Sequence, residues 1–299
     1  MSEPQVPQVL PQVPQALFVG SVHLDRMLRL DILPTPGETV IARESWTQLG
    51  GKAANQAVAA ARHTGVQVSL MACVGDDQDG REAERTMASL GVQTLLQISP
   101  KLPTGTSVAL LDAPGENVGV IVPGANAALS AAPLEALLAR SPPSLLVCQW
   151  ETQYETLQAL LIRTRAAGVV TLMNAAPWQE AYRDLLPLAD HVVVNAVEAQ
   201  GWSGTDTQAR RPTLPFGHGS VVVTLGAGGV LHYRQDQLTL DLPAPRVQAR
   251  STHGAGDHFI GVLAAHLAQG TALPVALEHA TRSAAGFVQL LHKHQEPFP

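Results

Sequence analysis

Several features that mark particular classes of protein are scarce in this sequence. Of its 299 residues only two are cysteines, Cys73 and Cys148, and both lie in apolar runs typical of buried strands. Inert core thiols are therefore expected rather than a disulfide. There are 19 lysines and arginines against 25 acidic residues, and they form no basic run. A nucleic-acid binder needs a basic surface to neutralise phosphates, so no nucleic-acid partner is expected.

Long hydrophobic segments are missing as well. No uncharged apolar stretch approaches the roughly 18 residues that a membrane-spanning helix requires, so no membrane partner is expected. Residues 1–15 repeat proline, glutamine and valine, and they lack the basic start and apolar block of a signal peptide. Repeated proline predicts an extended or disordered tail. We expect a cytoplasmic protein whose folded domain spans residues 16–299.

What the sequence does contain is an alternation of apolar runs and helical segments. Apolar residues make up 45% of the chain, and uncharged runs at 144–150, 169–174 and 191–195 are typical of buried strands. Such strands separated by helices indicate a parallel sheet covered on both faces. The predicted fold class is α/β, with a doubly wound, mostly parallel sheet. One of the helices is predicted to begin at Asp79, with Glu82 completing a capping box.

Two hairpins interrupt this alternation. The first lies at about residues 24–47 and is punctuated by proline and glycine, and the second lies at about 105–123. The two hairpins together can form a small separate sheet. A doubly wound sheet binds ligands at the carboxyl ends of its strands. We therefore predict that the small sheet is a lid over that edge.

The strongest local signal is Gly254-Ala255-Gly256-Asp257, which precedes an apolar helix. Small residues allow close approach of a ligand, and the N–H groups at a helix N-terminus favour an anion such as a phosphate. Asp257 in the first turn is then placed to take a proton from an attacking hydroxyl. A tight turn followed by an aspartate that complements the helix dipole explains the same residues equally well when they are taken alone.

Three further segments place polar residues beside predicted strands or helix starts. Gly51 and Asn55 lie where a glycine pair opens a helix, which suits a polyhydroxy ligand. Asp25 follows the first strand, and a carboxylate there can accept two hydroxyls. Asn195 and Glu198 follow a buried strand, where one carboxylate can reach a metal–nucleotide complex through water. Each segment also has a plainer interpretation, as a loop, an exposed hairpin residue or a capped helix start.

Taken together and in order, the motifs resemble one family, the ribokinase-like (PfkB) carbohydrate kinases. The segments that carry the resemblance are Gly20–Asp25, Pro34–Thr39, Gly50–Ala60, Gly124–Asn126, Asn195, Glu198, Thr224–Gly229 and Gly254–Asp257. They cover nearly the whole chain, and the first half is most similar to the ribokinase branch. The resemblance implies transfer of a phosphoryl group from ATP, with Mg²⁺, to a sugar hydroxymethyl group. Ribose or a related pentose is the expected acceptor.

The resemblance also implies a role for each matching residue. Asp257 is the catalytic base, and the backbone N–H groups of Gly254, Ala255 and Gly256 hold the transferring phosphate. The residues implied to bind the sugar are Asp25, Gly51, Asn55, Glu151 and Asp257. Those implied to bind the nucleotide are Asn195, Thr224, Gly226 and Gly229, with Glu198 near the metal. Phosphoryl transfer depends on positioning and charge stabilisation, and a lid excludes water that would hydrolyse ATP.

Some positions depart from the pattern of the family. His23 stands where an asparagine usually helps to grip the sugar, and Ala53 replaces a usual glycine. Ser251 stands where an aspartate is linked to a monovalent-cation site, so we expect activation by monovalent cations to be weak or absent. The span 201–219 is shorter than usual, which predicts that a helix near the nucleotide is missing.

Two other functions fit parts of the sequence. A nucleoside kinase of the same fold needs an aromatic surface to stack on a base, but aromatics make up only 4% of the chain and the predicted lid contains just Trp46. A non-catalytic sugar sensor is favoured by the altered cation loop and disfavoured by the retained Asp257. The largely apolar lid hairpins predict a homodimer formed through the lids.

Overall fold

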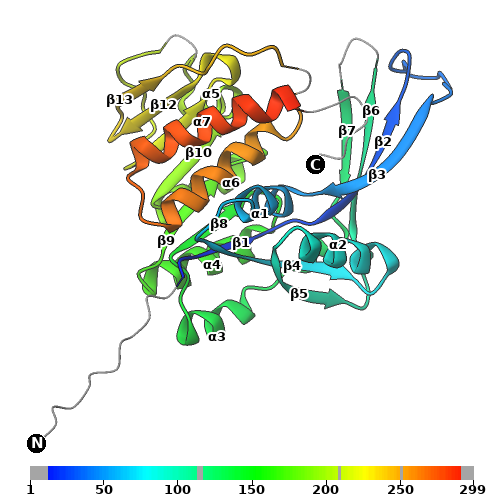
Figure 1. Ribbon diagram of the computed structural model, residues 1–299, viewed down its shortest axis with the longest axis horizontal. Helices are drawn as coiled ribbons and strands as arrows, with labels where there is room; N and C mark the ends of the chain where they lie inside the picture. The colour runs from blue at the N-terminus through cyan, green and yellow to red at the C-terminus, as the bar shows by residue number, and fades with distance from the viewer. Residues whose placement is uncertain (1–12, 113–116, 208–209, 250–251, 291–299) are drawn as a thin grey trace, which may run out of the picture.

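A mostly parallel sheet forms the centre of the protein (Figure 1). The computed structural model describes residues 13–112, 117–207, 210–249 and 252–290. Within them, nine strands form this sheet in the order β13-β12-β11-β10-β9-β8-β1-β4-β5, and only β12 and β13 run antiparallel to their neighbours. The strands are β1 (Gln15–Val19), β4 (Gln67–Gly75), β5 (Gln93–Ser99), β8 (Leu145–Gln149), β9 (Val170–Asn174), β10 (His191–Asn195), β11 (Val221–Thr224), β12 (Val230–Arg234) and β13 (Gln237–Leu242).

Helices cover both faces of this sheet, as the sequence predicts. The α-helices are α1 (Lys52–Ala61), α2 (Gln78–Ser89), α3 (Ala132–Arg140), α4 (Tyr154–Ala166), α5 (Ala196–Ser203), α6 (Ala255–Ala268) and α7 (Leu273–Leu290), and the 3-10 helices are η1 (Gly124–Ala128), η2 (Glu180–Leu188) and η3 (Gly226–Gly228). In β1, Phe18 packs with residues of α1, α6 and α7, whereas its neighbour Leu17 packs with residues of α3 and α4. Successive side chains point to opposite faces of a strand, so a strand that is buried on both faces is apolar throughout.

Two boundaries differ from those predicted. Strand β1 begins at Gln15, whose backbone pairs with that of Gln67, so the fold starts one residue earlier than expected. Helix α2 begins at Gln78, and the predicted capping box of Asp79 and Glu82 is wrong. The cap is Asp77, whose Oδ1 accepts a hydrogen bond from Gly80 N at 2.8 Å. Asp77 Oδ2 also accepts a hydrogen bond from Thr104 N, 27 residues further along the chain, at 2.7 Å, and sequence spacing does not show this second contact.

The lid is a second sheet with the order β3-β2-β6-β7. Its strands are β2 (His23–Arg29), β3 (Glu44–Gly50), β6 (Gly105–Leu111) and β7 (Asn117–Val122). The two hairpins meet where β2 pairs in parallel with β6. In Figure 1 this sheet stands to one side of the main body, next to the ends of β1 and β4. The predicted α/β fold with a two-piece β-sheet lid is confirmed.

Buried side chains fix the base of the lid to the central sheet. Asn126, 2% exposed, donates from Nδ2 to Val22 O at 2.8 Å and accepts at Oδ1 from Val22 N at 2.9 Å. Thr104 ties the start of β6 to Asp77 through both its N–H and its hydroxyl. These hydrogen bonds hold the base of the lid against the central sheet, while the outer ends of the lid strands extend away from the main body (Figure 1).

Other expectations concern single segments. Cys73 and Cys148 are buried free thiols, as predicted, and burial raises the pKa of Cys148 to about 12. Between the end of α5 and the start of β11, the described residues contain no further helix, which agrees with the short 201–219 span. Within the described ranges, every helix is too short or too polar to cross a membrane. The tail at 1–12 and the cation-loop residue Ser251 lie outside the described residues.

Candidate active site

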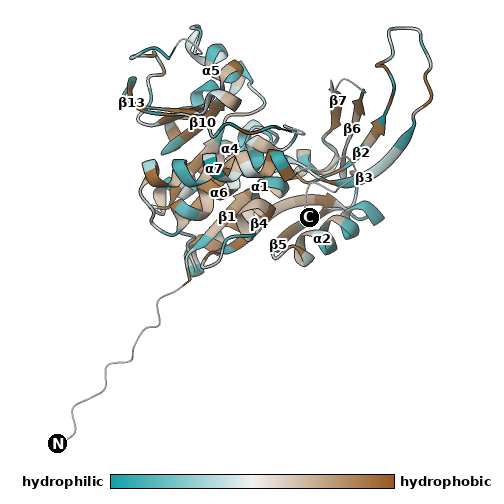
Figure 2. Cartoon of the chain, turned by 45° about the horizontal axis from the view of Figure 1, so that its top comes forward, coloured by the Kyte–Doolittle hydropathy of each residue, from teal (hydrophilic) through white to brown (hydrophobic). Residues whose placement is uncertain are grey.

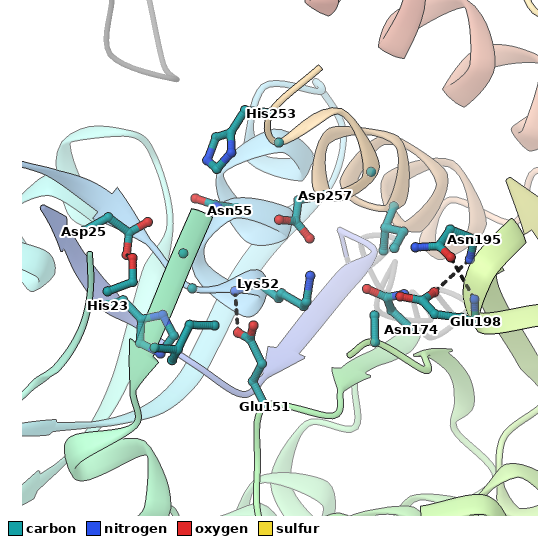
Figure 3. A pocket seen from close by; sticks show the side chains of 18 of the residues that line it. His23, Asp25, Lys52, Asn55, Glu151, Asn174, Asn195, Glu198, His253 and Asp257 are labelled. Carbon is teal, nitrogen blue, oxygen red and sulfur yellow. Dashed lines mark hydrogen bonds between the residues drawn. The ribbon is translucent and has the colours of Figure 1, made fainter. Parts of the chain in front are cut away.

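One cavity of about 420 Å³ lies at the carboxyl ends of the parallel strands, between the main sheet and the lid. Strand β1 lies in the sheet between β8 and β4. From β1 the sheet extends to β4 and β5 on one side and to β8 and the later strands on the other, so the strand order changes direction at β1. Ligands bind at such switch points in doubly wound sheets. Figure 3 shows Asp25 and His23 at one end, Asp257, Lys52 and Glu151 in the middle, and Asn174, Asn195 and Glu198 at the other end.

The N-terminus of α6 forms the wall at the middle of the cavity. Gly254 is the N-cap in a left-handed conformation, with φ at 73°, and Gly254 and Gly256 line the cavity. A Cβ at Gly256 would meet open space, so its backbone is accessible to a ligand. Ala255 does not line the cavity, and its N–H donates to Thr252 O at 3.2 Å. The first N–H groups of a helix lack partners one turn earlier, which favours an anion at this point.

Asp257 lies in the first turn of α6, opposite the side chain of Lys52 (Figure 3). Burial raises the pKa of Asp257, and the charge of Lys52 together with a hydrogen bond from Gln56 opposes this rise only in part. Burial lowers the pKa of Lys52, but the carboxylates of Asp257, Glu151 and Glu198 outweigh it, so the pKa lies above its ordinary value. A proton acceptor with a raised pKa thus stands beside a charged ammonium group.

Strands of the lid supply one end of the cavity. Asp25 in β2 is 8% exposed, and Ser107 Oγ in β6 donates to its Oδ1 at 2.6 Å. A Cβ on Gly50 would overlap the Asp25 carboxylate, so this position needs a glycine to admit the side chain. His23 lines the cavity beside Asp25. This end of the cavity offers acceptors that suit the hydroxyl groups of a sugar.

The start of α1 holds two further residues that are predicted to bind the sugar, Gly51 and Asn55. Gly51 is the N-cap of α1 with φ at 92°, and a Cβ there would overlap the carbonyl of Ser21, so only glycine fits without strain. Glu151 Oε2 accepts from Ser21 Oγ at 2.5 Å and from Lys52 N at 3.1 Å, so the carboxylate is held in one position. Asn55 lines the cavity, and its buried Oδ1 has no partner among the described residues.

Strands β10 and β11 supply the opposite end. Asn195 caps α5 by accepting from Glu198 N at 2.9 Å, while Glu198 Oε2 accepts from Asn195 N at 2.7 Å. This capping box confirms the plainer interpretation of the pair, yet both residues also line the cavity, as does Thr224. Burial raises the pKa of Glu198, and the hydrogen bond from Asn195 and the charge of Lys52 oppose the rise incompletely.

Gly226 and Gly229 lie outside this cavity. They form a tight turn between β11 and β12, in which Gly229 N donates to Gly226 O at 3.0 Å and Leu225 N donates to Gly229 O at 2.8 Å. The next segment is strand β12. The turn begins directly after Thr224, so the two glycines lie next to the lined region but do not form its wall.

Sequence reasoning missed three residues of the site. Lys52 is the only lysine or arginine among the described residues that line the cavity. Asn174 at the end of β9 and the buried Gln56 in α1 carry no local motif. For Lys52 the available signal was a charge directly after two glycines in a chain with few lysines. For Asn174 it was a polar residue that ends an apolar strand.

Comparison with known proteins gives concordant results. Residues 14–292 match the family described as pfkB family carbohydrate kinase. A ribokinase of Schizosaccharomyces pombe is 32% identical over 292 residues, with 91% of each chain covered, and a deoxyribokinase of Salmonella typhi is 32% identical over 277 residues, with 89% of this chain and 90% of the relative covered. The crystal structure of a ribokinase from Cryptococcus neoformans in complex with ADP has a TM-score of 0.80 at 28% identity and covers 95% of this chain and 96% of that one.

The family match and the relatives define a kinase that acts on a small acceptor alcohol, and the fold agrees with them. The chain belongs to the pfkB family of carbohydrate kinases, and it is a sugar kinase that uses ATP.

Proposed function

We propose that the protein phosphorylates the hydroxymethyl group of free ribose or a related pentose, in the cytoplasm where ATP is available. One observation carries the proposal. Asp257 and Lys52 stand in a single cavity between hydroxyl-binding acceptors at the lid and a polar end formed by β10 and β11. The ribokinase relatives act on ribose by name, which supports the same acceptor class here.

In the proposed mechanism, Asp257 takes the proton of the sugar hydroxyl as its oxygen attacks the terminal phosphorus of ATP. A new P–O bond forms to the sugar, the bond to the bridging oxygen breaks, and ADP leaves with the electron pair. Lys52 and the backbone N–H groups of Gly254 and Gly256 stabilise the charge on the transferring phosphoryl group. Asp25, Asn55 and Glu151 orient the sugar.

The polar end of the cavity fits a magnesium–nucleotide complex. Within the described residues no group of three or more metal-binding side chains occurs, which suits an ion held mainly by phosphates and water with few protein ligands. Glu198 Oε2 already accepts a hydrogen bond in the helix cap and is not free for direct contact with the ion. Glu198 would therefore hold such an ion through water. When bound, Mg²⁺ supplies charge neutralisation at the phosphates.

The acceptor is predicted to be an unphosphorylated sugar. Lys52 is assigned to the reaction centre, and the described lining residues offer no second lysine or arginine to bind a sugar phosphate. ATP-dependent phosphorylation should therefore be measured across free pentoses, deoxypentoses, hexoses, sugar phosphates and nucleosides. We expect the highest kcat/KM for a free pentose, with ribose first, and a higher value for any sugar phosphate would contradict the proposal. His23 fills space at the sugar end, so the ranking of pentoses tests its influence.

The same panel separates the two alternative functions. Trp46 packs under Arg29 and does not line the cavity. The lid residues that line it are His23, Asp25, Ser107, Ala109, Gly119 and Ile121, so no phenylalanine, tyrosine or tryptophan of the lid is placed to stack on a base. A nucleoside kinase would nevertheless show its highest kcat/KM with a nucleoside. A sugar sensor would bind a sugar, measured by calorimetry, without consuming ATP.

A homodimer through the lids is part of the proposal. In β7 the residues that line the cavity alternate with Val118, Val120 and Val122, which are 49%, 62% and 51% exposed on the other face. Figure 2 shows that β6 and β7 carry mainly hydrophobic residues although they stand away from the main body. An apolar face and an unpaired strand edge favour association with a second lid.

The Val120→Asp variant is expected to convert this dimer to a monomer, because it places a charge within the apolar face. Light scattering at micromolar concentration measures the mass. Val275→Asp, at a 46% exposed position of α7, is the matched control and should remain dimeric. A monomeric mass for the unmodified protein would rule the lid dimer out.

A further inference from the structure

A chain of buried side-chain amides runs beneath the cavity floor and ends on Asp257. Gln149 Nε2 in β8 donates to Gln56 Oε1 in α1 at 2.7 Å. Gln56 Nε2 then donates to Asp257 Oδ1 in α6 at 2.9 Å and to Asn174 Oδ1 in β9 at 3.2 Å. Gln56 and Gln149 are both 0% exposed. Four elements that are distant in sequence therefore meet at one amide group.

The orientation of the Gln56 amide follows from the groups around it. Asn174 Nδ2 donates to the carbonyl of Val193 at 3.2 Å, and a carbonyl can only accept, so Asn174 must present its oxygen to Gln56. An ionised Asp257 also only accepts. If the Gln56 amide were reversed, its oxygen would face two acceptors in a buried site. Gln56 therefore presents its NH₂ group to the carboxylate.

We infer that Gln56 is a positioning residue for the catalytic base: its buried amide fixes the Asp257 carboxylate toward the cavity, and Gln149 holds that amide in place. The inference rests on the proposed function and adds a residue to it. Gln56 does not line the cavity, so it acts through Asp257 rather than on the substrate. A buried donor to a carboxylate both restricts its rotation and favours its ionised form.

Several charged groups act on the same carboxylate, and the effect of Gln56 must be separated from theirs. Lys52 from α1 lowers the pKa of Asp257, Glu151 from the loop after β8 raises it, and a hydrogen bond from the Asn55 side chain lowers it further. The charge of Asp257 in turn raises the pKa of Glu198. His253 lines the cavity on the loop before α6. None of these groups changes when Gln56 is replaced by methionine, which has similar length and no donor.

The Gln56→Met variant is expected to lose about 10- to 100-fold in kcat, because small misplacements of a catalytic group are costly. The sugar dissociation constant, measured by calorimetry, should change by less than about threefold, since the protein side chains that contact the sugar are unchanged in the variant. Loss of the donor raises the pKa of Asp257, so the acidic limb of the kcat profile should move to higher pH. Gln149→Met should produce a smaller change in the same direction.

Thr281→Val is the matched control for removal of a buried hydrogen bond. Thr281 is buried in α7, donates to Leu277 O at 2.8 Å and does not line the cavity. Its pH profile should coincide with that of the unmodified protein, even if its melting temperature falls. A purely structural role for Gln56 would give the same result as this control, namely a lower melting temperature with an unshifted profile.

Titration of the Asp257 carboxyl by ¹³C NMR, assigned with Asp257→Asn, tests the link without turnover. It therefore distinguishes failure of this inference from failure of the proposed sugar kinase activity, which the substrate panel decides. A shift to higher pH in folded Gln56→Met supports the inference, and coincident titrations overturn it. If Gln56→Met does not fold, Gln149→Met decides by the same criterion.

Discussion

Replacing Asp257 by asparagine is expected to lower kcat by about 10²- to 10⁴-fold, the range for loss of a general base. Asparagine keeps the size of the side chain and can still accept a hydrogen bond from Gln56, so the geometry around α6 is preserved. Sugar binding by calorimetry should be nearly unchanged, because Asp25, Asn55 and Glu151 remain. Steady-state kinetics with saturating ATP and sugar measure the loss.

The matched control is Asp79→Asn, which removes an aspartate from the first turn of another helix, α2, outside the cavity lining. Its rate should equal that of the unmodified protein. Asp257→Asn should also melt at the same temperature or higher at neutral pH. Burial raises the pKa of Asp257, so the ionised carboxylate is a cost to folding that increases as pH rises through that pKa. A variant that retains more than a tenth of the original rate would show that another group is the base.

Much of the fold was accessible from sequence because burial on both faces forces apolar strands. Phe18 and Leu17 face different helical layers, and so neither position of β1 could be polar. The lid was found because proline and glycine interrupt the alternation of strand and helix. The start of α2 was misplaced because Asp77 and Asp79 are both plausible caps. A contact with Thr104, 27 residues away, helps to hold Asp77, and local spacing carries no sign of it.

In the site, too, residues that belong to a local motif could be predicted, whereas residues that depend on distant partners could not. Asp257, Gly51 and Asn195 lie in short segments whose neighbouring residues already indicate a binding or catalytic role. Gln56 could not be found in this way, because its partner Asp257 lies 201 residues further along the chain. Lys52 was not predicted for a related reason. Its electrostatic surroundings depend on carboxylates supplied by three other segments, and a lysine at a helix start is ordinarily solvent-exposed.

The Lys52→Met variant is expected to lose about 10²- to 10³-fold in kcat, comparable to removal of a group that stabilises charge in a transition state. Among the described residues, no other lysine or arginine lines the cavity, so no neighbouring cation compensates for the loss. The backbone N–H of residue 52 still donates to Glu151 in the variant, so the start of α1 is retained. Kinetics at saturating ATP and sugar measure the effect.

Lys101→Met serves as the matched control, because Lys101 is exposed and outside the cavity lining. Lys52 also lowers the pKa of Asp257, so Lys52→Met should move the acidic limb of the rate profile to higher pH in addition to lowering its plateau. The two effects have different origins. The plateau at high pH reports phosphoryl-charge stabilisation alone, since Asp257 is ionised there in both proteins. A normal plateau with a shifted limb would show that Lys52 only lowers the pKa of Asp257. An unchanged profile would show that Lys52 has no part in the reaction.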